Sequence, residues 1–265
     1  MKNEFKMYED GIWGMHLEES ESTQTQLKSW VESEQSQQQC AIVTTIVQPG
    51  GMGRLGRKWD CLQNSLAFSF CASAHPKFML SSLEVGVLLL QFLKGSFSGG
   101  RALFLKWPND LLCLDGEEYK KCGGILITVT GERLIVGIGL NLYPSPHDND
   151  VSTTSYTSPL GFIFDSESEF VACNHSMGEH GKFQHTIPLQ FYRYYLKNRF
   201  CGTEDLIQQW CSYCAHLNRV VSFSCEEAVP LFRGIFMGLG PQGEAVVRDL
   251  RTGISKHFIS GSLAL

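Results

Sequence analysis

Short runs of apolar residues, many of them β-branched or aromatic, recur along the chain between glycine, proline and polar turns. Runs of this length and composition are typical of β-strands. The Gly131-Glu132 pair, which separates two such runs, is typical of a hairpin turn. The predicted strands are Cys40–Val47, Leu66–Ala72, Leu103–Trp107, Ile125–Val129 and Leu134–Ile138.

Other segments show the apolar periodicity of amphipathic helices. The first is expected from Ser22 to about Glu32, because Thr23 and Gln26 have the spacing of a capping box and an apolar stripe follows. Two later helices are expected at 189–199 and 203–216.

A further helix is expected between the second and third predicted strands. Ser81 and Glu84 repeat the capping-box spacing, and Gly95 is a natural stop after Lys94. Strands joined as hairpins and interrupted by such helices predict an α+β fold, a mixed β-sheet with helices packed on one face.

The segment 145–187 breaks this regularity. It is rich in Pro, Ser, Asp, Asn, Gly and His, and it predicts a long loop with one short apolar piece at 160–164. From Arg219 onward, short strand-like runs alternate with glycine turns. We therefore predict two domains, residues 1–217 with the 145–187 insertion and a small β-barrel-like module at 218–265.

Composition narrows the function classes. The chain has 265 residues, 43% of them hydrophobic, and a formal net charge of −5. This charge gives no general electrostatic reason to bind nucleic acid. The apolar runs are too short for a membrane-spanning helix, and the first 20 residues lack the apolar core of a signal peptide. The ten cysteines are scattered along a chain of enzyme size, which favours reduced thiols over disulfides. We expect a cytoplasmic protein, with import into an organelle left open.

The stretch Gln48–Trp59, QPGGMGRLGRKW, carries the strongest chemical signal. It places four glycines, two arginines and a lysine between two predicted strands. Glycine lets the backbone approach a ligand and presents bare N–H donors, and Arg54, Arg57 and Lys58 add positive charge. Such a connection is suited to closing over an anion, although on its own it is more typical of a mobile basic loop on the surface.

Three further clusters follow in order: KWPND at 106–110, KKCGGIL at 120–126 and GIGLN at 137–141. Each lies at a strand end or a tight connection. Their lysines, asparagines and aspartate supply positive charge, two-faced amides and a candidate Mg²⁺ ligand. Together with the glycine and arginine loop they indicate a site for a nucleotide and a carboxylate.

In these motifs the sequence resembles the biotin protein ligase family. The family loop reads roughly GRGRxGRxW, and Gly51–Trp59 (GMGRLGRKW) matches it at every position but one. KWPND is present unchanged, and the family's K-x-G-G-I-L and G-x-G-x-N motifs correspond to 121–126 and 137–141. The resemblance covers nearly the whole chain and is weakest at about 145–187.

The resemblance implies a catalytic fold like that of class II synthetases and an SH3-like C-terminal domain. It also implies a monofunctional biotin–[biotin carboxyl-carrier protein] ligase that uses ATP and Mg²⁺ to form biotinyl-5′-AMP. The biotinyl group then passes to a lysine of a carboxylase carrier domain. Expected partners are biotin, ATP and that domain, with no nucleic acid or membrane. The oligomeric state is expected to be a monomer or a weak homodimer.

Site residues follow from the motif positions. Lys121 and Arg54 are implied to be catalytic, and Asp110 is implied to hold Mg²⁺. The residues implied to bind biotin are Ser22, Thr23, Gln24, Gln48, Gly51, Arg54, Lys121, Gly124 and Gly139. The residues implied to bind ATP are Arg54, Arg57, Trp59, Lys106, Asn109, Asp110 and Asn141.

Two positions depart from the family pattern. Met52 replaces an arginine associated with loop closure on biotin, which predicts weaker retention of the adenylate. Gln24 stands where asparagine is common, so a longer amide would have to reach biotin from this position.

Three other functions remain open. A lipoate–protein ligase shares the fold and the adenylation chemistry, but it is not expected to carry KWPND together with K-x-G-G-I-L. A biotin-sensing repressor would carry a helix-turn-helix domain before the catalytic region, and no basic recognition helix precedes Ser22. A ligase-like protein that only binds biotin is the third.

Two smaller motifs carry weaker signals. Cys173, His175, His180 and His185 resemble a metal cluster, but their spacing matches no common zinc pattern. Cys211 and Cys214 have redox spacing without the corresponding βαβ context, so packing is the expected role of these two cysteines.

Overall fold

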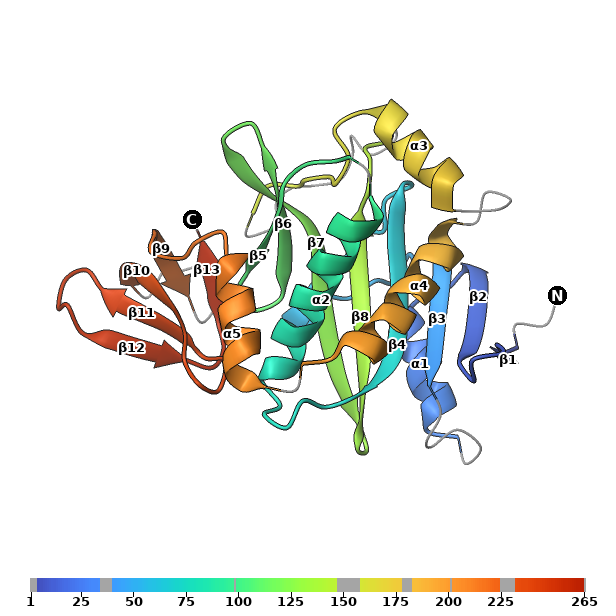
Figure 1. The fold of residues 1–265 in the computed structure, drawn as a ribbon, viewed down its shortest axis with the longest axis horizontal. Coiled ribbons are helices and arrows are strands. Elements are labelled where there is room, and N and C mark those ends of the chain that lie inside the picture. Colours follow the sequence, from blue (N-terminus) through green and yellow to red (C-terminus); the bar gives the residue numbers. More distant parts are fainter. Residues whose placement is uncertain are drawn as a thin grey trace.

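The computed structural model describes residues 4–33, 40–97, 99–146, 158–177, 183–200, 202–224 and 232–264. A mixed eight-stranded sheet with the strand order β1-β2-β3-β4-β8-β7-β6-β5 forms the main body (Figure 1). β2 and β3 pair in parallel, and the other neighbours pair antiparallel. The strands are β1 Lys6–Met7, β2 Trp13–Glu19, β3 Ala41–Val47, β4 Ser65–Ser73, β5 Leu103–Lys106, β6 Asp110–Asp115, β7 Glu118–Thr130 and β8 Arg133–Asn141.

Side chains of successive strand residues point to opposite faces, so each of the central strands serves two cores. Ile42 of β3 belongs to the larger core, under α2 and α4, whereas its neighbours Ala41 and Val43 belong to a smaller core that also contains Leu27 of α1. The helices are α1 Thr23–Val31, α2 Leu80–Ser96, α3 Glu167–Met177, α4 Phe183–Asn198 and α5 Thr203–Ser212, with a 3₁₀ turn η1 at Arg54–Gly56.

The predicted α+β class is therefore confirmed, with one difference. Helices were expected on one face, but α1 packs on the face opposite α2 and α4. The N-terminal half of the chain also contains β2 and β6, which were not predicted. Neither strand contains a run of β-branched residues, which was the signal that identified the other strands.

A second, five-stranded antiparallel sheet lies beside the β5 and β6 end of the main sheet (Figure 1). Its order is β12-β11-β10-β9-β13, with β9 Val220–Ser224, β10 Phe232–Leu239, β11 Ala245–Asp249, β12 Ser255–Phe258 and β13 Ser262–Ala264. The buried Trp107 indole fixes it to the main sheet by donating to the Gly243 carbonyl, at 3.1 Å. The domain boundary proposed at 217 remains a prediction.

Neither predicted capping box is formed. The N-cap of α1 is Ser22, whose side chain accepts from Thr25 N–H, because the Thr23 hydroxyl is used by Gln48 and Ser69 instead. α2 begins one residue before Ser81, whose hydroxyl accepts from His75 N–H. Glu84 instead pairs with Arg199 at 2.8 Å. The side chains of Thr23, Ser81 and Glu84 therefore bond to groups elsewhere in the fold rather than to the backbone at the start of their own helices.

Helix ends also differ from the sequence prediction. Gly95 lies inside α2, which ends at Ser96. α5 stops at Ser212 rather than at His216, because the next residues pair with β5. Leu105 N–H donates to Tyr213 O at 2.8 Å, and Ala215 N–H donates to Leu105 O at 2.9 Å.

The prediction of a loop throughout 145–187 was wrong in part. α3 lies within it and buries Phe170 and Cys173. α4 starts at Phe183, six residues before the predicted start at residue 189, and it contains Pro188. Proline removes one backbone hydrogen bond from the helix. The free energy gained by burying the side chains of Phe183 and Ile187 outweighs this loss.

The eight cysteines in the described ranges are free thiols, and Cys211 and Cys214 pack against the larger core, as expected. His185 lies on α4, where its ring accepts or donates a hydrogen bond at 2.6 Å from the Thr44 hydroxyl. His180 and the His175 side chain lie outside the described residues. Within the described part of the chain, no three metal-binding side chains gather. No described helix is long and apolar enough to cross a membrane.

Candidate active site

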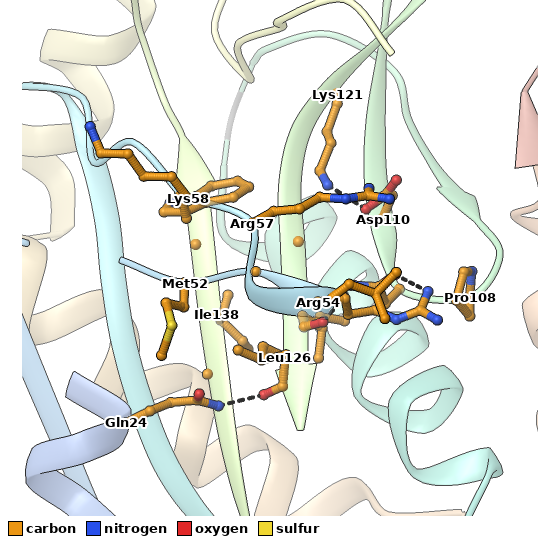
Figure 2. Close-up of a pocket in the computed structure, with 18 of the residues that line it drawn as sticks. Gln24, Met52, Arg54, Arg57, Lys58, Pro108, Asp110, Lys121, Leu126 and Ile138 are labelled. Carbon is orange, nitrogen blue, oxygen red and sulfur yellow. Dashed lines mark hydrogen bonds and ion pairs between the residues drawn. The ribbon is translucent and has the colours of Figure 1, made fainter. Parts of the chain in front are cut away.

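A pocket opens on the sheet face that carries α1, between the start of that helix, the 50–59 loop, the β5–β6 connection and strands β7 and β8 (Figure 2). The edge of the C-terminal sheet completes its wall. Most residues predicted for the site line this pocket: Ser22, Thr23, Gln24, Gln48, Arg54, Arg57, Trp59, Asn109, Asp110, Lys121, Gly124 and Gly139. The structure thus brings together residues spread over more than 110 positions of the sequence. Their individual roles remain predictions.

Gly51, Lys106 and Asn141 were also predicted, and these three do not line the pocket. Lys106 lies behind Asp110, with 2% of its surface exposed. Asn141 is buried and donates from Nδ2 to Gly161 O at 3.2 Å. Gly51 packs inside the 50–59 loop, where a Cβ would lie 2.5 Å from the Trp59 carbonyl oxygen.

A buried carboxylate held between two lysines forms the charged centre of the site. Asp110 Oδ1 lies 2.5 Å from Lys121 Nζ, and Oδ2 lies 3.4 Å from Lys106 Nζ. Burial alone raises the pKa of the Asp110 carboxyl, but the charges of the two lysines outweigh burial and hold that pKa below its ordinary value. Burial lowers the pKa of the Lys106 ammonium, an effect that Asp110 opposes.

A β-bulge in β7 determines the direction of Lys121. Leu112 pairs with Lys121 but Leu111 pairs with Gly123, so Cys122 is the extra residue. Residues 121 and 124 would face opposite sides of a regular strand. The bulge places Lys121 on the same face as Gly124, which pairs with Asp110.

The Trp59 indole packs against two glycines at the base of the site. Gly124 and Gly139 are register partners on β7 and β8. A Cβ on Gly139 would lie 2.5 Å from the Trp59 indole, and one on Gly124 would lie 3.5 Å from it. The Lys121 ammonium is 5.6 Å from the Trp59 ring centroid, within the range of a cation–π contact. The buried Trp59 Nε1–H has no hydrogen-bond partner among the described residues.

The 50–59 loop carries its cations over the pocket. Arg54 Nη1 donates to Asn109 Oδ1 at 3.3 Å, and Figure 2 shows the Arg57 side chain extending toward Asp110 and Lys121. Leu55 adopts a left-handed φ of 59° in the η1 turn between the two arginines. Met52, the departure from the family motif, is 58% exposed, lines the pocket and pairs with Lys58 through an isolated β-bridge.

At the α1 end, the pocket is bordered by a chain of polar groups. Gln48 Oε1 accepts from Thr23 N–H at 2.8 Å and from the Thr23 hydroxyl at 3.0 Å. That hydroxyl lies 2.8 Å from the Ser69 hydroxyl. A buried network of this kind holds donors and acceptors in fixed directions.

Gln24 connects α1 to the sheet at the same end. Its Nε2 donates to Leu126 O at 2.7 Å (Figure 2), and its side chain covers Gly137, where a Cβ would lie 2.8 Å from Nε2. The longer amide therefore reaches the β7 backbone. Ser22, also predicted to bind biotin, uses its hydroxyl to cap α1.

The described residues do not fit a resident Mg²⁺ ion. Protein Mg²⁺ sites usually combine one or two carboxylates with substrate phosphates. Asp110 is the only carboxylate that lines this pocket, and both of its oxygens face ammonium groups. The arrangement of these residues therefore does not support the predicted role of Asp110 as a Mg²⁺ ligand.

Sequence reasoning missed several lining residues. Ser69 is a polar residue on the buried β4 strand, and this unusual position was the available signal for it. Leu126 and Gly137 lie inside recognised motifs but were not named. Ser224, Gly261 and Ser262 come from the C-terminal sheet, and no sequence signal connected them to the site.

Residues 17–143 match the model of the Biotin/lipoate A/B protein ligase family. A curated relative, the bifunctional ligase/repressor BirA of Salmonella typhimurium, is 30% identical over 113 residues. That match covers 39% of this chain and 33% of the relative, so it spans about a third of the length of BirA.

Solved structures of biotin protein ligases match almost the whole chain. The Aquifex aeolicus biotin protein ligase in complex with biotin and ATP has a TM-score of 0.68 and 22% identity, and the match covers 95% of this chain and 97% of that one. The biotin acetyl coenzyme A carboxylase synthetase of Helicobacter pylori with bound biotinylated ATP has a TM-score of 0.62 and 19% identity, covering 92% and 98%. The Leishmania major biotin protein ligase in complex with biotin has a TM-score of 0.60 and 18% identity, covering 94% and 98%.

At these identities the structural matches establish the fold, and the family model covers the region that supplies most of the residues of the site. Residues 17–143 therefore form a domain of the biotin/lipoate A/B protein ligase family, and the chain as a whole has the fold of the biotin protein ligases.

Proposed function

We propose that this protein is an ATP-dependent biotin protein ligase that activates biotin as biotinyl-5′-AMP and transfers it to a lysine of a biotin carboxyl carrier domain. The observation that carries the proposal is the arrangement of Lys121, Asp110 and Arg54 in one pocket with the Trp59 indole and the Thr23–Gln48 network. It joins a cationic centre to a site with fixed polar groups. The proposed setting is the cytoplasm, or an organelle if the chain is imported.

In the first step the biotin carboxylate attacks the α-phosphorus of ATP, and the bond to the leaving pyrophosphate breaks. Two anions must approach each other, so the barrier is lowered by fixed positive charge and by alignment. Lys121 neutralises the carboxylate and then the charge developing on the α-phosphate. Arg54 presents its planar fork to the same oxygens.

Asp110 and Lys106 support this centre from behind. The Asp110 carboxylate is ionised at neutral pH, because its pKa lies below its ordinary value. It fixes the direction of the Lys121 ammonium at 2.5 Å. Lys106, buried behind it and bonded to the Ser158 hydroxyl at 2.8 Å, adds positive charge toward the phosphates.

The loop protects the mixed anhydride from water. Trp59 covers Gly124 and Gly139, and Arg57 extends over the charged centre (Figure 2). The buried Trp59 Nε1–H, for which the described part of the chain offers no acceptor, is a donor that a ligand oxygen would satisfy. An adenylate held under this loop would hydrolyse slowly before the acceptor arrives.

The α1 end suits the ureido ring of biotin, which presents two N–H groups and one carbonyl. Thr23, Ser69 and Gln48 supply hydroxyl and amide groups in fixed positions. The dithiolane ring of lipoate has no N–H or carbonyl group and would add no hydrogen bond to this network. This difference favours biotin over lipoate as the substrate.

In the second step the ε-amine of the acceptor lysine attacks the adenylate carbonyl carbon. The new C–N bond forms an amide and the amine loses a proton, while the bond between the carbonyl carbon and the phosphate oxygen breaks and AMP leaves with that oxygen. The closed loop would have to open a path for that lysine between the arginines and the C-terminal sheet.

The test is ATP–pyrophosphate exchange with biotin, lipoate and octanoate in parallel, followed by transfer to a biotin carrier domain. Exchange with biotin alone, followed by transfer, is the expected result. Exchange with lipoate or octanoate alone would move the chain to the lipoate ligases. Absence of exchange with all three acids, in a protein that binds biotin, would make it a binding protein and end the proposal.

A further inference from the structure

The main chain of Lys121 is held from both sides of its strand. On one side it pairs with Leu112 of β6, whereas β8, the neighbour of β7 further along, does not reach it. The segment 158–164 lies in the place that β8 leaves beside Lys121. Lys121 N–H donates to Pro159 O at 2.7 Å, and Gly161 N–H donates to Lys121 O at 2.9 Å. Residues outside every recognised motif therefore fix the backbone of this lysine.

The same segment reaches the second lysine of the charged centre. The Ser158 hydroxyl accepts from Lys106 Nζ at 2.8 Å, while Asp110 Oδ2 lies 3.4 Å from that nitrogen. The ammonium is buried, and its three N–H donors need acceptors in fixed directions. Ser158 supplies one of these directions, so the segment 158–164 contacts both lysines that flank Asp110.

Groups outside the pocket hold this segment in place. The Arg101 backbone N–H donates to Ile163 O at 2.8 Å, and the Arg101 guanidinium donates to Phe164 O at 2.7 Å. From the end of β8, Asn141 Nδ2 donates to Gly161 O at 3.2 Å. None of these five residues lines the pocket. The position of the segment is therefore set by the fold around it.

Gly161 is the point of closest approach between this segment and β7. A Cβ at this position would lie 2.6 Å from Lys120 Cβ and 2.7 Å from Cys113 Sγ. Lys120 Cβ is attached directly to the backbone and has no freedom to turn away. A residue with a side chain at position 161 would therefore push the segment away from the Lys121 backbone.

We propose that the segment 158–164 positions Lys106 and Lys121 for adenylation, with Ser158 and Gly161 as its positioning residues. The inference rests on the proposed function and extends it, because neither positioning residue lines the pocket. Stabilisation of the charge that develops on the α-phosphate depends on where the two ammonium groups lie. A displacement of about 1 Å can lower a rate by about 10²-fold, so contacts behind the lysines affect the reaction.

The first experiment measures pyrophosphate exchange in Gly161→Ala, Lys121→Ala and the double variant. Gly161→Ala should lower kcat by about tenfold and change the KM for biotin little. Because the glycine acts through Lys121, the double variant should be no slower than Lys121→Ala. Gly95→Ala is the control, since a Cβ at Gly95, near the end of α2, would meet no atom within 4 Å.

The second experiment applies the same comparison to Ser158 and Lys106. Ser158→Ala should lower kcat by about tenfold, and Ser158→Thr, which keeps the hydroxyl, should restore it. In the Lys106→Met background, Ser158→Ala should have no further effect. A serine that only stabilised the fold would not show this dependence on Lys106.

Losses that multiply in the two double variants would overturn the proposal, because the segment would then act by a route other than the two lysines. Unchanged kcat in both Gly161→Ala and Ser158→Ala would also overturn it. Urea denaturation checks that each variant is folded, and the Ser158 series decides the question if Gly161→Ala is not. Failure of the proposed function is recognised separately. If the wild-type protein activates another acid or only binds ATP, the two comparisons are made with that acid or as ATP affinities.

Discussion

The Lys121 ammonium lies 2.5 Å from the Asp110 carboxylate, although the two residues occupy different strands. The contact exists because the bulge at Cys122 turns Lys121 onto the face of β7 where Gly124 pairs with Asp110. The carboxylate thus directs the lysine toward the pocket, and the same lysine faces Trp59.

Replacing Lys121 by alanine should abolish most adenylate formation and retain appreciable biotin affinity. The lysine is assigned to charge that develops during the reaction, so the rate of pyrophosphate exchange should fall by about 10²–10³-fold. Exchange kinetics and biotin titration measure the two effects. Lys120→Ala is the control, because Lys120 pairs with Asp115 outside the pocket. Parallel losses of rate and biotin affinity would contradict the role given to Lys121.

Gly139→Ala should displace Trp59 from the pocket, because the new methyl group would lie 2.5 Å from the indole. Biotin-dependent AMP release without an acceptor should increase, since water would reach the adenylate. Gly124→Ala is the matched comparison. Its methyl group would meet the same indole at 3.5 Å, an ordinary contact.

The exposure of Trp59 to solvent is measured by tryptophan fluorescence. Because the chain has five tryptophans, the spectrum of each glycine variant is compared with that of the same variant carrying Trp59→Phe, and the difference gives the emission of Trp59. A shift toward the solvent-exposed emission is expected in Gly139→Ala and not in Gly124→Ala. The same spectrum in both variants would show that Gly139 does not hold the indole in place.

His216 should make the protein less stable as pH falls. Its ring is fully buried, and both nitrogens are without hydrogen-bond partners in the described structure. Burial, with the charges of Lys106 and Arg219, lowers the pKa of His216 to about 3. The unfolded chain binds a proton near pH 6.5 and the folded chain does not, so stability is retained above that pH and lost as pH falls from about 6.5 toward 3.

At pH 5 the free energy of unfolding is lower by about 2 kcal/mol because of this residue. Only the pKa of His216 in the unfolded chain sets this value, because the pKa in the folded protein lies well below pH 5. His216→Leu should remove this slope, which urea denaturation at pH 7 and pH 5 measures. An unchanged difference between the two pH values would show that His216 is protonated in the folded protein.

Arg199→Met should destabilise the protein by about 3 kcal/mol, because it leaves the Glu84 carboxylate buried without its cation. Glu84 is 0% exposed, and Arg199 Nη2 lies 2.8 Å from it. The pair connects α2 to the end of α4. Urea denaturation measures the change.

The double variant Glu84→Gln with Arg199→Met completes a thermodynamic cycle. It should be more stable than Arg199→Met alone, since the buried charge is gone. Additive effects of the two substitutions would indicate that the ion pair contributes no coupling.

The sequence by itself determined the α+β class, the main strands and most of the candidate site. Strands such as Ala41–Val47 were predictable because a buried strand is a continuous β-branched run. Lys121, Arg54, Trp59 and Asp110 were predictable because their motifs join glycines and charges at strand ends, and these properties are local in the chain.

Only the tertiary structure decided how those groups meet. The bulge at Cys122 depends on pairing with β6, and nothing in the local sequence specifies it. The hydroxyl of Thr23 and the carboxylate of Glu84 found partners across the fold rather than within their helices. Ser262 and Gly261 reached the pocket because Trp107 holds the second sheet against the first. Contacts between residues far apart in sequence depend on packing, which a local pattern does not encode.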